Sequence, residues 1–316
     1  MDRQGSLAAL RRAVAATARA HLTDEGRWCV ALSGGPDSLA LTAVASGLRP
    51  TTALIVDHGL QAGSSDVAAT AREHALKLGC VDAQVLCVDV GLTGGPESAA
   101  RTARYAALDT ARGGAPVLLA HTLDDQAETV LLGLGRGSGA RSIAGMRSWD
   151  PPWLRPLLGV RRAVTHSACA ELGVTPWQDP HNVDARFTRA RLRAEVLPLL
   201  EDVLGGGVAE ALARTAAALR EDNDALDDQA AAVSVEGGPA TARLADLPAA
   251  VRRRVIRAWL LTSGASDLTD VQIRGVDRLV TDWRGQGGVA VGSRLRNERL
   301  FAGRRDGVLI TYRESV

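Results

Sequence analysis

The chain contains 316 residues, which is long for one domain of roughly 100 to 200 residues and suits two. Hydrophobic residues make up 46% and charged residues 23% of the sequence, with a net charge of +1, which excludes a fibrous or disordered chain. No stretch reaches the roughly 18 apolar residues of a membrane span, and the N-terminus lacks the apolar core of a signal peptide. We therefore expect a cytoplasmic protein that does not bind a membrane.

Apolar runs alternate with helical patterns through the first 200 residues. Such alternation is typical of a parallel sheet with helices on both faces. It predicts a doubly wound parallel-sheet α/β domain over residues 1–200, with ligands beyond the carboxyl ends of the strands. The candidate strands are residues 28–32, 53–56, 84–88 and 117–120, and the candidate helices are residues 37–46, 66–78, 97–112 and 124–134.

The composition changes after residue 200. We interpret residues 201–236 as a connecting acidic helix and residues 237–316 as a second, smaller α+β domain. Residues 247–316 carry 13 arginines against 7 acids, so this second domain is basic. The predicted elements are helices at 208–232, 247–261 and 269–281 and strands near 289–291 and 308–312.

A glycine-rich loop, Ser33-Gly34-Gly35-Pro36-Asp37-Ser38, stands between a predicted strand and a predicted helix. Its glycines let backbone N–H groups converge on an anion at the positive end of the helix. It lacks both the lysine of the Walker loop and the G-x-G-x-x-G spacing, while Asp37 offers a carboxylate for Mg²⁺ and Ser38 a hydroxyl. The loop predicts a phosphate site; a capped glycine-rich turn is the alternative.

An acidic cluster follows the last predicted strand, in the run from His121 to Thr129. On a helix that begins here, Asp124, Asp125 and Glu128 share one face, because residues three or four apart are neighbours. Acids in a first turn also cap helices, which is the alternative. Their position at a strand end favours metal binding, recognition of an ammonium group or removal of its proton.

These motifs resemble a known family. The loop and its strand, residues 30–38, resemble those of the N-type ATP pyrophosphatases, or PP-loop superfamily, and three further segments are similar to motifs of the tRNA(Ile)-lysidine synthases within it: residues 56–60, 101–105 and 121–129. Shorter matches lie at 136–139, 145–146, 155–158 and 179–198. The sequence departs from the family pattern at Thr122, His181 and Ala190.

The resemblance implies an ATP-dependent ligase acting in tRNA processing. ATP would adenylate the C2 oxygen of the wobble cytidine in tRNA(Ile) with a CAU anticodon and release diphosphate. The ε-amine of L-lysine would then attack C2 and expel AMP. The product, lysidine, would change the codon that is read from AUG to AUA and the amino-acid identity from Met to Ile.

The resemblance also implies roles for individual residues. ATP would contact Ser33, Gly34, Gly35, Pro36, Asp37, Ser38, Asp57 and His58, with Asp37 holding Mg²⁺ through the phosphates. Lysine would meet Asp124, Asp125 or Glu128, and the last two, as catalytic residues, would bind its ammonium group or help to deprotonate it. Arg104 and His121 would stabilise negative charge during adenylation.

Arginines are the expected tRNA contacts, because phosphates are held mainly by Arg and Lys. The candidates are Arg189, Arg191 and Arg193 in the first domain and Arg252, Arg253, Arg254 and Arg257 in the second. An ordinary solvated face of an arginine-rich chain is the alternative. Trp259 and Trp283 are expected in the core, since most Trp side chains are largely buried.

Three other functions stay open. A tRNA thiolase should pair cysteines for a cluster or sulfur relay, whereas Cys29, Cys80, Cys87 and Cys169 lack C-x-x-C spacing and are interpreted as buried, reduced thiols. An amidating ligase would share only the phosphate loop. A non-catalytic RNA- or nucleotide-binding module would gain nothing from three carboxylates beside that loop. The oligomeric state is also open, and a homodimer is one candidate.

Overall fold

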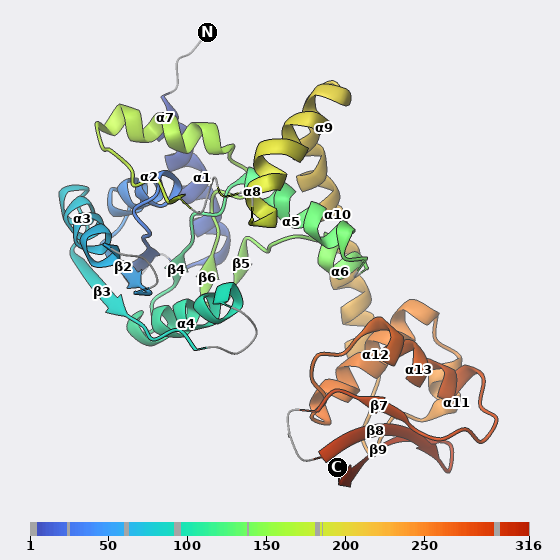
Figure 1. Ribbon diagram of the computed structural model, residues 1–316. Helices are drawn as coiled ribbons and strands as arrows, with labels where there is room; N and C mark the ends of the chain where they lie inside the picture. The colour runs from blue at the N-terminus through green and yellow to red at the C-terminus, as the bar shows by residue number, and fades with distance from the viewer. Residues whose placement is uncertain are drawn as a thin grey trace. The chain divides into compact units, whose positions relative to one another are not determined.

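A computed structural model describes residues 5–23, 26–59, 63–91, 96–137, 139–180, 184, 186–293 and 298–315. The chain forms two compact units (Figure 1). The first comprises Met1–Arg136 and Ser142–Ala216, and the second comprises Gly137–Arg141 and Ala217–Val316. The division falls inside a long helix, α10 (Val208–Ala231).

The first unit is built on a six-stranded sheet in the order β3-β2-β1-β4-β6-β5. All neighbouring strands run parallel except β5, which is antiparallel to β6. This architecture confirms the predicted α/β class. The strands are β1 (Trp28–Ala31), β2 (Thr51–Asp57), β3 (Asp82–Cys87), β4 (Val117–Leu118), β5 (Trp149–Asp150) and β6 (Trp153–Leu154). The last two are too short for a sequence pattern to reveal.

Helices cover both faces of this sheet, as a doubly wound fold requires. Side chains alternate between faces along a strand, so Val30 of β1 packs in one core and Cys29 and Ala31 pack in the other. The first core contains residues of α1 (Ser6–His21), α2 (Pro36–Ser46), α3 (Ser64–Lys77) and α7 (Arg162–Leu172). The second contains Leu108 of α4 (Pro96–Ala111), which Figure 1 shows across the sheet from α2 and α7.

The remaining helices before α10 follow β4. They are α5 (Leu123–Gly135), α6 (Ala140–Ile143), α8 (Thr188–Arg191), a π-helical turn at Leu192–Val196 and α9 (Leu197–Val203). The first two residues of α6 belong to the second unit. Leu123 and Ala127 of α5 form a small core with Leu197 and Ala209. This core fixes α5 against the segment that contains the first group of predicted tRNA-binding arginines.

The second unit packs helices against a three-stranded antiparallel sheet in the order β7-β8-β9. Its elements are α11 (Thr241–Ala245), α12 (Ala249–Thr262), α13 (Asp270–Thr281), β7 (Val289–Val291), β8 (Glu298–Arg305) and β9 (Val308–Ser315). Trp259 lies in this core, as expected. Trp283 does not: it is 38% exposed, and the guanidinium of Arg304 stacks 5.4 Å from the centroid of its ring.

Candidate active site

The glycine-rich loop leaves β1 and turns directly into α2. Gly34 has a φ of +82°, a left-handed conformation that strains any residue with a Cβ atom. Pro36 stands in the first turn, where its missing N–H costs no hydrogen bond, so Gly35 and Pro36 begin the helix without a side-chain cap. The N-terminal end of α2, with its partial positive charge, is therefore left for an anion.

Ser38 shapes this loop from inside. Its hydroxyl donates to the carbonyl of Gly35 at 3.0 Å and accepts from the backbone N–H of Ser33 at 3.2 Å. The side chain is 6% exposed. The Ser38 hydroxyl thus holds the loop closed on itself, which adds a structural duty to its predicted contact with phosphate.

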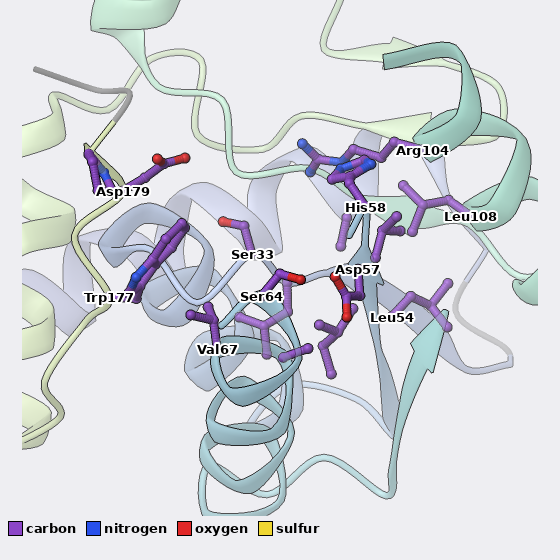
Figure 2. Close-up of a pocket in the computed structure, with 16 residues that line it drawn as sticks. Ser33, Leu54, Asp57, His58, Ser64, Val67, Arg104, Leu108, Trp177 and Asp179 are labelled. Atoms are coloured by element: carbon purple, nitrogen blue, oxygen red, sulfur yellow. The ribbon is translucent and has the colours of Figure 1, made fainter. Parts of the chain in front are cut away.

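A cavity of about 400 Å³ opens beside the loop at the ends of β1 and β2, a size that suits a nucleoside. Figure 2 shows Trp177 and Asp179 on one side of it and His58 and Arg104 on the other, with Ser33 between them. The backbone N–H of Trp177 donates to the carbonyl of Gly34 at 3.0 Å, which ties this wall to the loop. The cavity therefore lies directly next to the predicted phosphate position.

Trp177 is a residue of the cavity that no sequence motif singled out. The available signal was a tryptophan just before the matched segment at 179–198, but most Trp side chains are largely buried in cores, so its residue type alone did not indicate a site. His181, one of the departures from the family pattern, lies outside the described residues.

Asp57 and His58 follow β2 and line the cavity. The carboxylate of Asp57 accepts from the backbone N–H of Gly59 at 3.0 Å, which fixes the turn. The pKa of the His58 imidazole is lowered by burial and by the charge of Arg104. Its buried Nδ1 atom has no hydrogen-bond partner in the described part of the chain, so it is available to a polar ligand atom.

Asp125 caps α5 and also reaches into the site. Its Oδ2 atom accepts from the backbone N–H and the hydroxyl of Thr122, both at 2.8 Å, in a reciprocal capping box. Its Oδ1 atom faces Arg162, whose Nη2 atom lies 2.6 Å away. Burial raises the pKa of Asp125, but Arg162 and the hydrogen bonds from Thr122 lower that pKa by a larger amount. The net shift is downward, so the carboxylate is ionised. Thr122, which departs from the family pattern, is thus the helix cap.

Glu128 is enclosed by two arginines. The Nε atom of Arg193 lies 2.9 Å from its Oε1 atom, and Arg162 donates to the same oxygen at 3.3 Å. The Glu128 side chain is 1% exposed, whereas that of Asp125 is 16% exposed. A substrate amine could therefore reach Asp125 with less rearrangement than Glu128.

Asp124 points elsewhere. Its Oδ2 atom accepts from the backbone N–H of Arg162 at 2.7 Å, and its Oδ1 atom lies 3.6 Å from Nε of Arg161. It thus caps the start of α7. The structure brings Asp125 and Glu128 together on the two guanidinium groups and leaves Asp124 outside this arrangement.

Asp37 lies between the loop and the acids. Its Oδ1 atom accepts a hydrogen bond from the Thr165 hydroxyl, and its Oδ2 atom lies 3.6 Å from Nε of Arg162. Burial raises the pKa of this carboxyl, and the Thr165 hydrogen bond opposes that rise. Arg162 thus contacts carboxylates from both α2 and α5.

His121 precedes the acidic helix, next to Arg104 and Arg155. Burial, assisted by these arginines and opposed by Asp125, lowers the pKa of the His121 imidazole to about 3. His121 is consequently neutral, and its buried Nδ1 atom lacks a hydrogen-bond partner among the described residues. Arg155, buried and donating to the carbonyl of Arg147 at 3.0 Å, was predicted only as part of a motif match and is a further charge at this site.

The predicted tRNA-binding arginines of the first unit have different surroundings. Arg189 is exposed. Arg191 pairs with Glu195 on the surface at 2.8 Å. Arg193 also belongs to the acidic site, through its bond to Glu128.

Three of the four arginines predicted for tRNA in the second unit are engaged in internal contacts. Arg252 is 8% exposed, and its Nε atom lies 2.6 Å from Oδ1 of Asp277. Arg253 bonds the other oxygen of Asp277 at 2.9 Å, and Arg254 bonds Asp227 at 2.9 Å. Arg252 therefore differs from the prediction: it lies inside the unit and joins α12 to α13, because a buried acid needs a buried cation.

The described part of the chain has neither a metal-binding cluster of its own nor a membrane-spanning helix. Its residues contain no group of three or more His, Cys, Asp or Glu that could hold a metal ion by themselves. None of its helices combines the length and apolar character needed to cross a membrane. Of the cysteines, Cys29, Cys80 and Cys169 are buried as expected, whereas Cys87 is exposed at the end of β3, one of the two edge strands of the sheet.

The parallel sheet and the glycine-rich loop before α2 define an ATP-using protein of the PP-loop class, and the model of the PP-loop domain matches residues 8–200. The model of the TilS substrate binding domain matches residues 240–304. A solved U34-tRNA thiolase, NcsA from Methanococcus maripaludis with its [4Fe-4S] cluster, has a TM-score of 0.55 at 18% identity over 68% of this chain and 80% of that chain. That similarity shows the fold alone.

Relatives at much higher identity cover the chain from end to end. The tRNA(Ile)-lysidine synthase of Mycobacterium bovis is 72% identical over 100% of both chains, and that of Mycobacterium leprae is 68% identical over 99% of both. The tRNA(Ile)-lysidine synthase of Rhodococcus erythropolis is 60% identical over 96% of this chain and 95% of its own. The chain belongs to the tRNA(Ile)-lysidine synthase family. The predicted family and the identification as an ATP-dependent enzyme are thereby confirmed.

Proposed function

We propose that the protein joins the ε-amine of free L-lysine to C2 of the wobble cytidine in tRNA(Ile) with a CAU anticodon. ATP is consumed, AMP and diphosphate are released, and the product lysidine changes the codon that is read from AUG to AUA. One observation supports this above the others: Asp37 of the phosphate loop and the acids Asp125 and Glu128 converge on the guanidinium of Arg162. A nucleotide position and an amine position thus adjoin, as ligation through an adenylate requires.

In the first step the cytidine O2 atom attacks the α-phosphorus of ATP, and the bond from that phosphorus to diphosphate breaks. The adenosine would lie in the cavity between Trp177 and His58, with the phosphates at the N-terminal end of α2. Arg104 would offset the negative charge that develops at phosphorus. His121, being neutral, would contribute a hydrogen bond and no charge.

In the second step the lysine nitrogen bonds to C2 as the bond from C2 to the AMP oxygen breaks. The amine must lose a proton to be a nucleophile. We assign Asp125 to meet the ammonium and accept its proton, because its side chain is 16% exposed against 1% for Glu128. Glu128 holds Arg162 and Arg193 in place.

Mg²⁺ is proposed as the cofactor at the phosphates. It commonly binds one or two carboxylates together with substrate phosphate oxygens, so Asp37 beside the loop fits it although no metal site made of protein groups alone occurs in the described chain. Bound there, Mg²⁺ would neutralise phosphate charge. Asp37 would provide the anchoring carboxylate, and a nearby cation would oppose the upward pKa shift that burial causes.

The tRNA would be held by both units. We propose a catalytic domain over residues 1–200, a connecting acidic helix over residues 201–236 and a tRNA-recognition domain over residues 237–316. The basic charge of the last region and its match to a substrate-binding domain support this division. The proposed contacts are Arg189, Arg191 and Arg193 in the first and Arg253, Arg254 and Arg257 in the last.

Two further expectations accompany this function. A tRNA-modifying enzyme is expected in the cytoplasm, where its substrates are. A homodimer is the assembly to test, by sedimentation of the purified protein with and without tRNA. A thiolase is not favoured, because the four cysteines lack C-x-x-C spacing, and Cys29, Cys80 and Cys169 are free, buried thiols.

The deciding experiment mixes the purified protein with ATP, labelled lysine and transcribed tRNA(Ile) bearing a CAU anticodon. Lysine should enter the RNA only when ATP and this tRNA are both present, and a CAU-bearing methionine tRNA is the matched control. Diphosphate release without lysine transfer would keep the adenylating enzyme but overturn lysine as the nucleophile. No turnover by folded protein would overturn the proposal.

A further inference from the structure

Arg162 stands at the start of α7, between the phosphate loop and the acidic helix. We propose that Arg162 is the positioning residue that couples the two half-reactions, acting through Asp37 in adenylation and through Asp125 and Glu128 in attack by the amine. It does so without touching either substrate. This inference rests on the proposed function and deepens it, because it assigns a role to a residue that no sequence motif singled out.

The geometry of its guanidinium supports this role. The Nη2 atom lies 2.6 Å from Oδ1 of Asp125, both Nη atoms lie 3.3 Å from Oε1 of Glu128, and Nε lies 3.6 Å from Oδ2 of Asp37. A guanidinium is planar and presents its five N–H groups in a fixed fork. Three carboxylates arranged around one such fork cannot shift independently, so α2 and α5 keep a fixed relation at the site.

The backbone of Arg162 is fixed as firmly as its side chain. Its N–H donates to Oδ2 of Asp124 at 2.7 Å, and its carbonyl accepts from the buried hydroxyl of Thr165 at 2.7 Å. Thr165 also bonds Asp37, and one turn later the thiol of Cys169 donates to the carbonyl of Pro36 at 3.3 Å. Helix α7 is therefore attached to both partner helices before any ligand arrives. Such preorganisation is what a positioning residue requires.

Charge gives a second reason for an arginine here. Asp125 and Glu128 are neighbouring buried carboxylates, and two such groups stay ionised together only beside a cation. Arg193 also contacts both, but its side chain is 32% exposed against 15% for Arg162. Arg162 is the more enclosed of the two, and it alone among these cations also reaches Asp37 in the described chain. Without Arg162, the two acids would keep only the more exposed Arg193 as a neighbouring cation.

The test separates the two half-reactions in Arg162→Ala and Arg162→Lys. Adenylation is followed as diphosphate release with tRNA and no lysine, and transfer is followed in a single turnover from preformed adenylated tRNA. We expect Arg162→Ala to lower both rates by about 100-fold, with the KM for ATP nearly unchanged. Arg162→Lys should recover little, because one ammonium cannot bridge three carboxylates.

Added methylguanidinium provides the readout that a merely structural role would not move. It should raise the rates of both half-reactions of Arg162→Ala about tenfold, since the free ion can occupy the vacated space between the acids. It should not raise either rate of Asp37→Ala. Arg19→Ala, which removes an exposed arginine from α1, is the control and should change neither rate.

Specific results would overturn the inference. Loss of only one half-reaction in Arg162→Ala would refute the coupling, and full activity of Arg162→Lys would refute the fork geometry. A lowered melting temperature with no rescue would make Arg162 a structural residue only. If the wild-type protein itself transfers no lysine, both the proposed function and this inference are refuted. The other results are obtained with an active wild type, so they refute the inference alone.

Discussion

The Nε atom of Arg193 lies 2.9 Å from the Oε1 atom of Glu128, although the two residues are 65 positions apart. An arginine in a basic segment, predicted to face RNA, therefore bonds the most buried acid of the site. The contact links the segment that precedes α9 to the acidic helix α5. Because Arg193 remains 32% exposed, RNA phosphate and Glu128 would compete for it.

Removing the Asp37 carboxylate should abolish diphosphate release. Asp37→Ala takes away the proposed metal ligand and the acceptor of the Thr165 hydrogen bond. We expect a loss of at least about 100-fold in ATP- and tRNA-dependent diphosphate release. Asp37→Asn keeps the shape and should lose nearly as much; if it retains wild-type activity, charge at this position is unimportant.

Glu128→Ala should impair lysine transfer more than adenylation. It leaves Arg193 without its buried partner and Arg162 with one carboxylate fewer, at a cost of about 3 kcal/mol in unfolding free energy. The two steps are measured separately, as diphosphate release and as lysine incorporation. Asp125→Asn is the comparison and should lose transfer without the same loss of stability. An equal loss of both steps in Glu128→Ala would contradict this division of roles.

Gly34 and Gly35 form a matched pair for substitution by alanine. At Gly34 the surrounding atoms leave room for a Cβ atom, which would lie 3.6 Å from Cβ of Ala71. The φ of +82° is unfavourable for alanine, however, so Gly34→Ala should cost about 1 to 2 kcal/mol of stability through backbone strain. Gly35 has φ of −74°, which alanine adopts freely. Thermal denaturation should show a lower melting temperature for Gly34→Ala only. Equal stability of the two variants would mean that the loop relaxes around the new side chain.

Stability should fall with acid because His121 is buried and neutral. Its pKa is lowered to about 3, while in the unfolded chain it returns to the ordinary value of 6.5. Between these values the unfolded state binds the extra proton, so stability is complete above pH 6.5 and declines as the pH falls toward 3. The expected loss from pH 7 to pH 5 is about 2 kcal/mol. Urea denaturation at both pH values should show a smaller loss in His121→Gln, and the exposed His166→Gln is the control; identical pH slopes in His121→Gln and the wild type would disprove the assignment.

Arg252 and Arg257 should separate stability from RNA binding. Arg252→Ala leaves the buried Asp277 with Arg253 as its remaining cation and should destabilise the protein by about 3 kcal/mol. Arg257→Ala should leave the melting temperature unchanged and weaken tRNA binding. The slope of the logarithm of the binding constant against the logarithm of the salt concentration should become less steep, by the amount expected for about one phosphate contact. Filter binding across a salt series decides this. Unchanged affinity in Arg257→Ala would remove this residue from the interface.

Local sequence patterns predicted β1 to β4, helices α2 to α5, the glycine-rich loop and the acidic helix start, but not α1 or the helices from α6 to α9. These features are local: helical and strand periodicities, the conformational freedom of glycine and the spacing of acids on a helix can all be read within a few residues. Strands of two residues, such as β5 and β6, were beyond such reading, because their pairing with a neighbour defines them.

The pairing of charges depends on the tertiary structure. Arg162 meets Asp37 across 125 positions of sequence, Arg193 meets Glu128, and Arg252 is buried against Asp277, although all three arginines look alike in an arginine-rich chain. Whether a cation faces solvent or a buried carboxylate depends on which helices pack together, and local spacing does not contain that information. For the same reason Trp177 became a cavity wall and Trp283 an exposed stacking surface only once the chain was folded.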